Sequence, residues 1–307
     1  MSQDTRFLLL SAMYENGGNV THRHLDGHPQ MFVYPFESQL GTRLVTDPLS
    51  AMFPVKYRWP VFALDATPEE DYEAIIDEEM KVRTKTPHVS KFRHMPMDLS
   101  DSDRKDRYIR YVDDTGRSRS NNVAMFFRAT FDAWMDYKRT GEEIVYVGYS
   151  PIVVVDAPTI LSDMPHAHIL HVVRNPWSAY ADTKKRPVPL SLASYMQGWT
   201  LNQYYALLHQ KACPERVHIV RLEDVVEDPR EALGPICKRL GLEPAVTLKT
   251  PTWNGSTLEE VYPWGTIRSA TPDANRATAK ELSPEERDAI RARTWQYLDV
   301  FEYTSFI

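Results

Sequence analysis

The sequence is poor in cysteine, in positive charge and in long apolar runs. Its two cysteines are too few for a disulfide framework, and no Cys/His cluster has the spacing of a zinc site. The net charge of −6 excludes the basic excess that nucleic-acid binding requires. The first apolar run follows an acidic residue, Asp4, and is too short to span a bilayer. We therefore expect a soluble, cytoplasmic protein with no membrane span and no nucleic-acid partner.

What is present is the composition of an ordinary globular chain. With 42% hydrophobic residues, its 307 residues are enough for one large α/β domain or two small ones. Four apolar runs resemble strands: Phe7–Ala12, Ile152–Val155, Ile169–Val173 and Val217–Arg221. The segments between them are long enough for helical crossovers. This alternation predicts a central, mostly parallel sheet with helices on both faces.

Several connecting segments carry helix signals. Leu233–Leu240 has apolar residues at helical spacing, and Gly241 follows as a stop signal. A charged stretch at about 55–145 contains the helical candidates Glu69–Met80 and Asn122–Arg139. We expect this stretch to be a helical insertion between the first two core strands.

The C-terminal third begins with a long irregular segment. Thr250–Thr278 has little periodicity, and a structured loop of that length is uncommon unless it is functional. Ser283-Pro-Glu-Glu286 then has the pattern of a capping box, which predicts a final helix.

A pair of glycines follows the first apolar run. Gly17-Gly18 stands between Leu8–Ala12 and the helical candidate Val20–Leu25. The first turn of a helix attracts phosphate, and glycines let the backbone approach it closely. However, no Lys-Ser/Thr follows, and Glu15 stands where a cation would be useful. Both a phosphate cradle and a plain strand–helix turn fit this pattern.

An arginine ends the third apolar run. Ile169–Val173 leads directly into Arg174-Asn-Pro176. The carboxyl end of a core strand is where open α/β sheets bind ligands, and the planar fork of arginine suits a second phosphate. A surface arginine that caps a neighbouring helix is the alternative.

Taken in order, these motifs resemble the PAPS-dependent sulfotransferase family, with the motif order of its bacterial, carbohydrate and tyrosine members. The resemblance rests on Glu15–Gly18, Asp26-Gly-His-Pro29, Arg174-Asn-Pro176, Val220–Pro229 and Leu240-Gly-Leu242, and it covers about 1–50 and 145–300. It implies a P-loop-like three-layer fold, one domain over 1–307 and a loop at about 250–280 that covers the nucleotide.

The same resemblance assigns a nucleotide site. The residues that would cradle the phosphosulfate end of PAPS are Asn16, Gly17, Gly18, Asn19, Val20 and Thr21. Arg174 would bind the 3′-phosphate, together with a serine that the family usually places eight residues later. That position is Asp182 here, so Ser178 or Thr183 substitutes or the contact is lost. The basic contacts from the covering loop would be Arg268 and Arg276.

The resemblance also assigns a general base. In the family's carbohydrate and tyrosine members a glutamate lies just beyond the His-Pro, and Glu37 occupies that place. Its carboxylate would take the proton of the acceptor hydroxyl. A salt bridge at a strand end is the alternative role for Glu37. The flanking Tyr34 and Phe36 are then candidates to line the acceptor pocket.

Glu15 departs from the family pattern, which has Lys or Arg at this point to neutralise the leaving phosphate. Lys184, Arg23, or the loop amides with Asn16 would have to take over that task.

We therefore expect a sulfotransferase that moves a sulfuryl group from PAPS to a hydroxyl, or secondarily an amine, of a small molecule or saccharide, releasing PAP without a metal ion. Two alternatives stay open. One is a P-loop nucleotide kinase that uses ATP and magnesium, although Asn19-Val20 offers neither the lysine nor the hydroxyl it needs. The other is an inactive sulfotransferase-like nucleotide-binding protein. The sequence also leaves a homodimer open.

Overall fold

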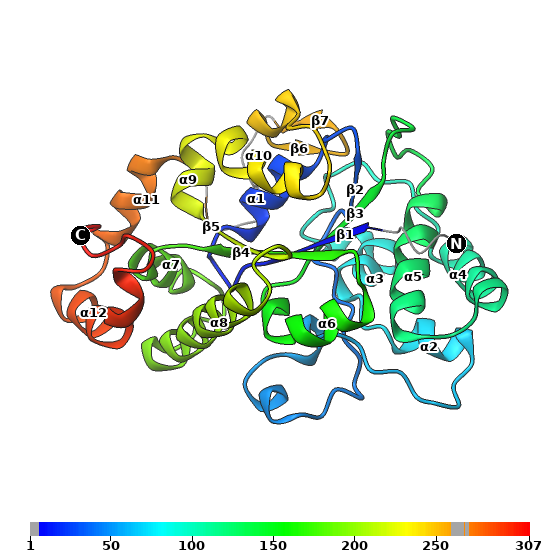
Figure 1. The fold of residues 1–307 in the computed structure, drawn as a ribbon, viewed down its shortest axis with the longest axis horizontal. Helices are drawn as coiled ribbons and strands as arrows, with labels where there is room; N and C mark the ends of the chain where they lie inside the picture. The colour runs from blue at the N-terminus through cyan, green and yellow to red at the C-terminus, as the bar shows by residue number, and fades with distance from the viewer. Residues whose placement is uncertain (1–5, 259–266, 268–269) are drawn as a thin grey trace.

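The centre of the molecule is a five-stranded parallel sheet (Figure 1). The computed structural model describes residues 6–258, 267 and 270–307. In chain order the strands of this sheet are β1 (Arg6–Ser11), β2 (Met31–Val33), β3 (Val145–Tyr149), β4 (Ala167–Val173) and β5 (Val217–Arg221). Their order across the sheet is β2-β3-β1-β4-β5, and every pairing is parallel. The expected α/β fold with a parallel sheet is confirmed.

Helices surround the sheet on both faces (Figure 1). Before β4 they are α1 (Gly18–Leu25), α2 (Pro68–Ala74), α3 (Glu78–Lys85), α4 (Asp101–Thr115), α5 (Arg119–Ala133) and α6 (Ala157–Asp163). After β4 they are α7 (Pro176–Thr183), α8 (Leu192–Ala212), α9 (Leu222–Glu227), α10 (Pro229–Arg239), α11 (Pro272–Ala279) and α12 (Pro284–Leu298).

Side chains on β1 show how the two faces are filled, because they alternate between them. Phe7 and Leu9 belong to a buried cluster with side chains of α5 and α6. Leu8 and Leu10 belong to a second cluster with side chains of α1 and α10. All four are at most 2% exposed, which explains why β1 reads as a continuous apolar run.

One predicted strand was wrong. Ile152–Val155 is not in the sheet: Val153–Asp156 forms a buried 3₁₀ turn, and the strand is β3, a few residues earlier. A short apolar run suits a buried turn as well as a strand. Gly148 weakens the strand signal of β3, yet the fold needs it there. A Cβ at this position would lie 2.8 Å from Ser38 Oγ and 2.9 Å from Phe127 Cζ.

The charged stretch at about 55–145 is helical, as expected, but it lies between β2 and β3 rather than directly after β1. The single helix expected at Glu69–Met80 is divided into α2 and α3, and Asp77 between them has a left-handed φ of 37°. The sequence pattern did not predict α4 at all. Whether residues 1–307 are one domain stays a prediction.

The C-terminal elements follow their sequence signals more closely. α10 covers the expected helix, and Gly241 beyond it has a φ of 71°. α12 begins at the predicted capping box of Ser283 and Glu286. The segment expected to be an irregular loop contains the two-stranded pair β6 (Thr252–Trp253) and β7 (Ser256–Thr257), and also α11, which Thr271 caps. Residues 259–266 and 268–269 of that segment are outside the described part of the chain.

A third buried cluster joins α7, α8 and α12, and it includes Trp177, Trp199 and Tyr297. It secures the region where β4 ends and α7 begins. Of the helices within 6–258 and 270–307, none is long and apolar enough to cross a membrane.

Candidate active site

The first turn of α1 follows directly from the carboxyl end of β1. Gly17 is the N-cap residue of the helix, with a φ of 86°, and as a glycine it supplies no capping side chain. Neither glycine tolerates a Cβ: at Gly17 it would lie 2.4 Å from Leu222 Cδ1, and at Gly18 it would lie 2.4 Å from the ring of Tyr149. The turn is therefore a close-packed backbone element at a helix N-terminus, where the backbone amides and the helix dipole suit an anion.

Asn16 holds this turn in place. Its Oδ1 accepts from the backbone N–H of Arg174 at 3.1 Å, and its Nδ2 donates to the Tyr14 carbonyl and the Tyr195 hydroxyl. Asn16 is fully buried. Its side chain thus ties the loop after β1 to the end of β4, instead of facing a ligand. Thr21 is also buried and donates to the Gly17 carbonyl at 3.2 Å.

A cavity of about 560 Å³ opens at the N-terminus of α1, and we call it the α1 cavity. Its lining includes four of the predicted nucleotide residues, namely Gly17, Gly18, Asn19 and Val20. Glu37, the predicted base, lines the same cavity. The structure therefore brings the helix N-terminus and this carboxylate to one space, as the motif order predicted.

Three phenols surround Glu37 in the α1 cavity. Burial is the main cause that raises the pKa of Tyr14 to about 12, with a smaller contribution from the Glu37 charge. Burial also raises the pKa of Tyr57 far above its usual value, and the Glu37 charge and a hydrogen bond with Glu37 add to this. Burial also raises the pKa of Tyr149 well above its usual value, and the Glu37 charge adds to this. All three hydroxyls therefore stay protonated at neutral pH and can donate to a carboxylate.

Within the described part of the chain, three cations line the α1 cavity, namely Lys56, Lys91 and Arg186. Lys56 forms an ion pair with Glu78, and Lys91 lies 3.2 Å from Glu79. Arg186 is more loosely held: its Nε is 4.0 Å from Glu15 Oε1, and its guanidinium lies 4.7 Å from the centre of the Tyr14 ring. Among the described cations that line the α1 cavity, Arg186 is thus the one paired with the side chain of Glu15, the position where the family has Lys or Arg.

The cations suggested from sequence lie elsewhere. Arg23 is buried beneath α1, where it contacts His22 Nδ1 and the ring of Trp253. Lys184 donates to Glu286 at 2.7 Å on the other side of α7. Neither lines the α1 cavity. Arg23 is close to the loop in sequence but its side chain is buried, whereas Lys184 follows α7 and pairs with Glu286.

Tyr34 and Phe36 do not line the cavity either. Tyr34 is fully buried and donates to Asp77 at 2.7 Å, while Phe36 packs against Phe92 and Trp253. The aromatic neighbours of Glu37 come instead from the loop after β1, the insertion and β3. No local sequence pattern marked them, because three separate segments supply them.

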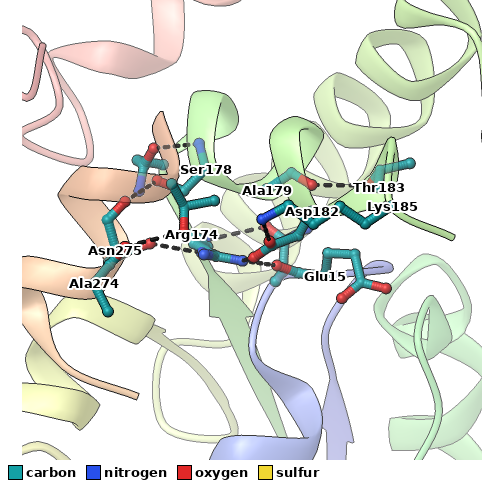
Figure 2. Close-up of polar contacts among 12 residues, drawn as sticks. Glu15, Arg174, Ser178, Ala179, Asp182, Thr183, Lys185, Ala274 and Asn275 are labelled. Carbon is teal, nitrogen blue, oxygen red and sulfur yellow. Dashed lines mark hydrogen bonds and ion pairs between the residues drawn. The ribbon is translucent and has the colours of Figure 1, made fainter. Parts of the chain in front are cut away.

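Arg174 lies at the end of β4, as expected, and is only 2% exposed (Figure 2). Its Nη1 donates to the Glu15 carbonyl and to Asp182 Oδ2, both at 2.8 Å, and its Nε donates to Asn275 Oδ1 at 2.8 Å. Asp182 also accepts from Lys185 at 2.9 Å. The fork of Arg174 therefore already holds an anion, and this anion is part of the protein.

Beside this pair lies a second cavity of about 200 Å³, which we call the Arg174 cavity. Arg174, Asp182, Lys185 and Asn275 line it, and Ile267 lines both this cavity and the α1 cavity. The two spaces are therefore adjacent, at the carboxyl ends of β1 and β4, where an open α/β sheet binds ligands.

Of the remaining predicted contacts, the described residues Ser178, Thr183 and Arg276 do not line the Arg174 cavity. Ser178 donates to the Asn275 carbonyl at 2.7 Å, and Thr183 donates to the Ala179 carbonyl at 2.8 Å (Figure 2). Both hydroxyls are fully buried. Arg276 is on α11 but exposed, 3.3 Å from Asp273. Arg268 lies outside the described residues.

Glu223 connects the elements around Arg174. It accepts from Asn175 and Asn275 at 2.8 Å and from Tyr303 at 2.6 Å. One carboxylate thus joins the first turn of α7, the helix α11 and the C-terminal segment. Among the described residues, no group of three His, Cys, Asp or Glu side chains is arranged to hold a metal ion.

Comparison with known proteins connects this geometry to a family. The model of the sulfotransferase family matches residues 17–245. The chain is similar in fold to the sulfotransferase domain from the Synechococcus PCC 7002 olefin synthase, with 16% identity, a TM-score of 0.56, and coverage of 97% of this chain and 94% of that one. It is also similar to the sulfotransferase domain from the curacin biosynthetic pathway, with 16% identity, a TM-score of 0.51, and coverage of 94% and 97%.

A comparison with the curated proteins finds no match. The structural neighbours show the P-loop-like α/β fold, and the family match begins at Gly17, directly before α1, and includes Arg174. The chain belongs to the sulfotransferase family.

Proposed function

We propose that the chain transfers a sulfuryl group from a nucleotide 5′-phosphosulfate of the PAPS type to a hydroxyl of a small molecule or saccharide, with Glu37 as general base. The observation that carries this proposal is that the α1 cavity contains both the N-terminus of α1 and the Glu37 carboxylate. The N-terminus of α1 binds the phosphate that leaves, and Glu37 takes the proton of the attacking hydroxyl.

The two ends of the cavity have different roles in the reaction. When bound, the donor supplies the sulfuryl group, and the S–O bond to its 5′-phosphate breaks as the acceptor oxygen forms a new bond to sulfur. Glu37 accepts the proton that the acceptor hydroxyl loses. The amides at the start of α1 and the guanidinium of Arg186 stabilise the negative charge that develops on the leaving phosphate.

Tyr14 and Tyr57 position the base. Their raised pKa values keep both hydroxyls protonated, so they act as donors beside Glu37 and hold its carboxylate in one orientation. Lys56 and Lys91 are already paired with Glu78 and Glu79, so they shape the acceptor side of the cavity rather than neutralise the donor.

A calorimetric titration tests the proposal against the kinase alternative. The purified protein is titrated with 5′-AMP, with PAP, and with ATP plus magnesium. Metal-independent binding of 5′-AMP or PAP supports a phosphosulfate site. If neither binds, or if ATP with magnesium binds more tightly than both, the proposed function is wrong.

A further inference from the structure

The most unusual feature of the site is the position of Asp182. It stands eight residues after Arg174, where the family usually has a serine that assists in holding a 3′-phosphate. Here its carboxylate lies 2.8 Å from Arg174 Nη1 and 2.9 Å from Lys185 Nζ, and its side chain is only 3% exposed. Among the described residues, the two cations that line this cavity, Arg174 and Lys185, are therefore bonded to the same internal carboxylate.

The fork of Arg174 is also occupied on its other edge. Nη1 donates to the Glu15 carbonyl in addition to Asp182, and Nε donates to Asn275. A bidentate contact to a phosphate needs two N–H groups of the fork that point the same way. Each bidentate edge of the fork, Nε with Nη2 and Nη1 with Nη2, includes one engaged nitrogen, so a bidentate 3′-phosphate would have to displace a bond that the protein makes to itself (Figure 2).

The negative charge of Asp182 also disfavours a 3′-phosphate. A 3′-phosphate carries negative charge, and Asp182 would face it across a cavity of only about 200 Å³. Asp182 repels such a phosphate directly, and its charge also offsets one of the two positive charges, Arg174 and Lys185, that line the described part of the cavity. The Ser178 and Thr183 hydroxyls offer no compensation, because both donate to backbone carbonyls.

A free ribose hydroxyl suits this cavity better than a phosphate. A carboxylate accepts a hydrogen bond from a hydroxyl without any cation. Dinucleotide-binding sheets make the same distinction, since an acidic residue there marks a free ribose hydroxyl and an arginine marks a phosphorylated one. The Arg174 cavity adjoins the α1 cavity through Ile267, so one nucleotide can reach both.

We propose that Asp182 selects a nucleotide with a free 3′-hydroxyl, so that the sulfuryl donor of this chain is adenosine 5′-phosphosulfate rather than its 3′-phosphorylated form, PAPS. This inference rests on the proposed function, because it concerns the donor of the same reaction. Arg174 then acts as a positioning residue: it holds Asp182 and the loop after β1 instead of contacting a phosphate. The leaving product is 5′-AMP, and the acceptor proton still passes to Glu37.

The test compares the two product nucleotides by calorimetry. Wild-type protein is expected to bind 5′-AMP at least as tightly as PAP. Tighter binding of PAP would overturn the inference while leaving the proposed function intact. If neither nucleotide binds, the proposed function itself fails, so the two failures are distinguishable.

Substitution of Asp182 sharpens the test. The Asp182→Ser variant restores the usual family residue and is expected to shift the preference toward PAP by about ten-fold or more, which corresponds to ~1.4 kcal/mol. The Asp273→Ser variant is the matched control, because it makes the same chemical change at a side chain that is 97% exposed and lines neither cavity. An unchanged preference in Asp182→Ser would contradict the role of Asp182. The wild-type titration decides the donor even if that variant does not fold.

Discussion

The guanidinium of Arg174 and the carboxylate of Asp182 form a buried ion pair, 2.8 Å apart, at the end of β4. Both side chains are at most 3% exposed. A buried pair tolerates the loss of both charges better than the loss of one, because a single remaining charge is left without its partner. The pair therefore leads to a prediction about the free energy of unfolding that does not depend on any ligand.

The Arg174→Met variant should lower the free energy of unfolding by about 3 kcal/mol, since Asp182 then keeps only the half-exposed Lys185 as a partner. The double variant Arg174→Met/Asp182→Leu should recover most of that loss. Urea denaturation measures both. A double variant as unstable as the single one would show that the pair is not the source of the effect.

Arg186 should matter for turnover more than for nucleotide affinity. Its Nε lies 4.0 Å from the Glu15 carboxylate, and among the described residues it lines the α1 cavity. We propose that it stabilises the negative charge that develops on the leaving phosphate. Loss of one such donor typically slows the chemical step about 100-fold or more. We expect this drop in kcat for Arg186→Gln, with a much smaller change in the Kd of 5′-AMP. Lys184→Gln, whose side chain pairs with Glu286, is the control and should retain its rate.

Gly18 should not tolerate alanine. The added Cβ would lie 2.4 Å from the Tyr149 ring, which is itself buried, so the start of α1 must shift. Overpacking of this kind costs about 1–3 kcal/mol, and the shift should also weaken nucleotide binding.

Gly234→Ala in α10 is the control for Gly18→Ala, because its Cβ would make only an ordinary contact, 3.5 Å from Pro244. Alanine there should stabilise the helix by up to ~1 kcal/mol. Equal stability of the two variants in urea denaturation would contradict the close packing of the loop.

Because His171 is buried, we expect the stability of the protein to depend on pH. His171 is on β4, where burial lowers its pKa to about 4, and Nε2 contacts Gln203 Oε1 at 2.9 Å. The unfolded chain takes up a proton near the ordinary pKa of 6.5, whereas the folded chain does not until about pH 4. The unfolded state thus binds more protons in this window, and stability is lost as the pH falls from 6.5 to 4.

His171 alone should account for a loss of about 2 kcal/mol between pH 7 and pH 5. The His171→Gln variant keeps a donor toward Gln203 and should lose correspondingly less over this range. His166→Gln, at an exposed position, should behave as wild type. Denaturation curves at the two pH values would contradict the assignment if His171→Gln lost as much stability as the wild-type protein.

The parts of the fold and site that sequence could predict are those determined by neighbouring residues. Gly17-Gly18 between an apolar strand and a helix, Arg174 directly after β4 and the capping box of α12 all depend on local spacing. The family resemblance predicted Glu37 as the general base, and Glu37 lines the α1 cavity.

What sequence could not predict depends on contacts between distant segments. Lys56 and Lys91 reach the α1 cavity from the insertion, so no spacing relates them to the loop. Arg186 belongs to the cationic run after α7, but only the fold shows that it, rather than Lys184, faces Glu15. The pairing of Asp182 with Arg174 was equally hidden, because residue identity does not reveal which partner an arginine takes.

The central claim is that Glu37 is the base for sulfuryl transfer in the α1 cavity. The most direct measurement follows radiolabelled sulfuryl transfer from adenosine 5′-phosphosulfate and from PAPS to a panel of phenols, alcohols and saccharides. It compares wild type with Glu37→Gln and with the exposed control Glu69→Gln, which lines neither cavity. We predict that Glu37→Gln lowers the transfer rate by about 10²–10⁴-fold with unchanged nucleotide affinity. Transfer by Glu37→Gln at the wild-type rate would contradict the account.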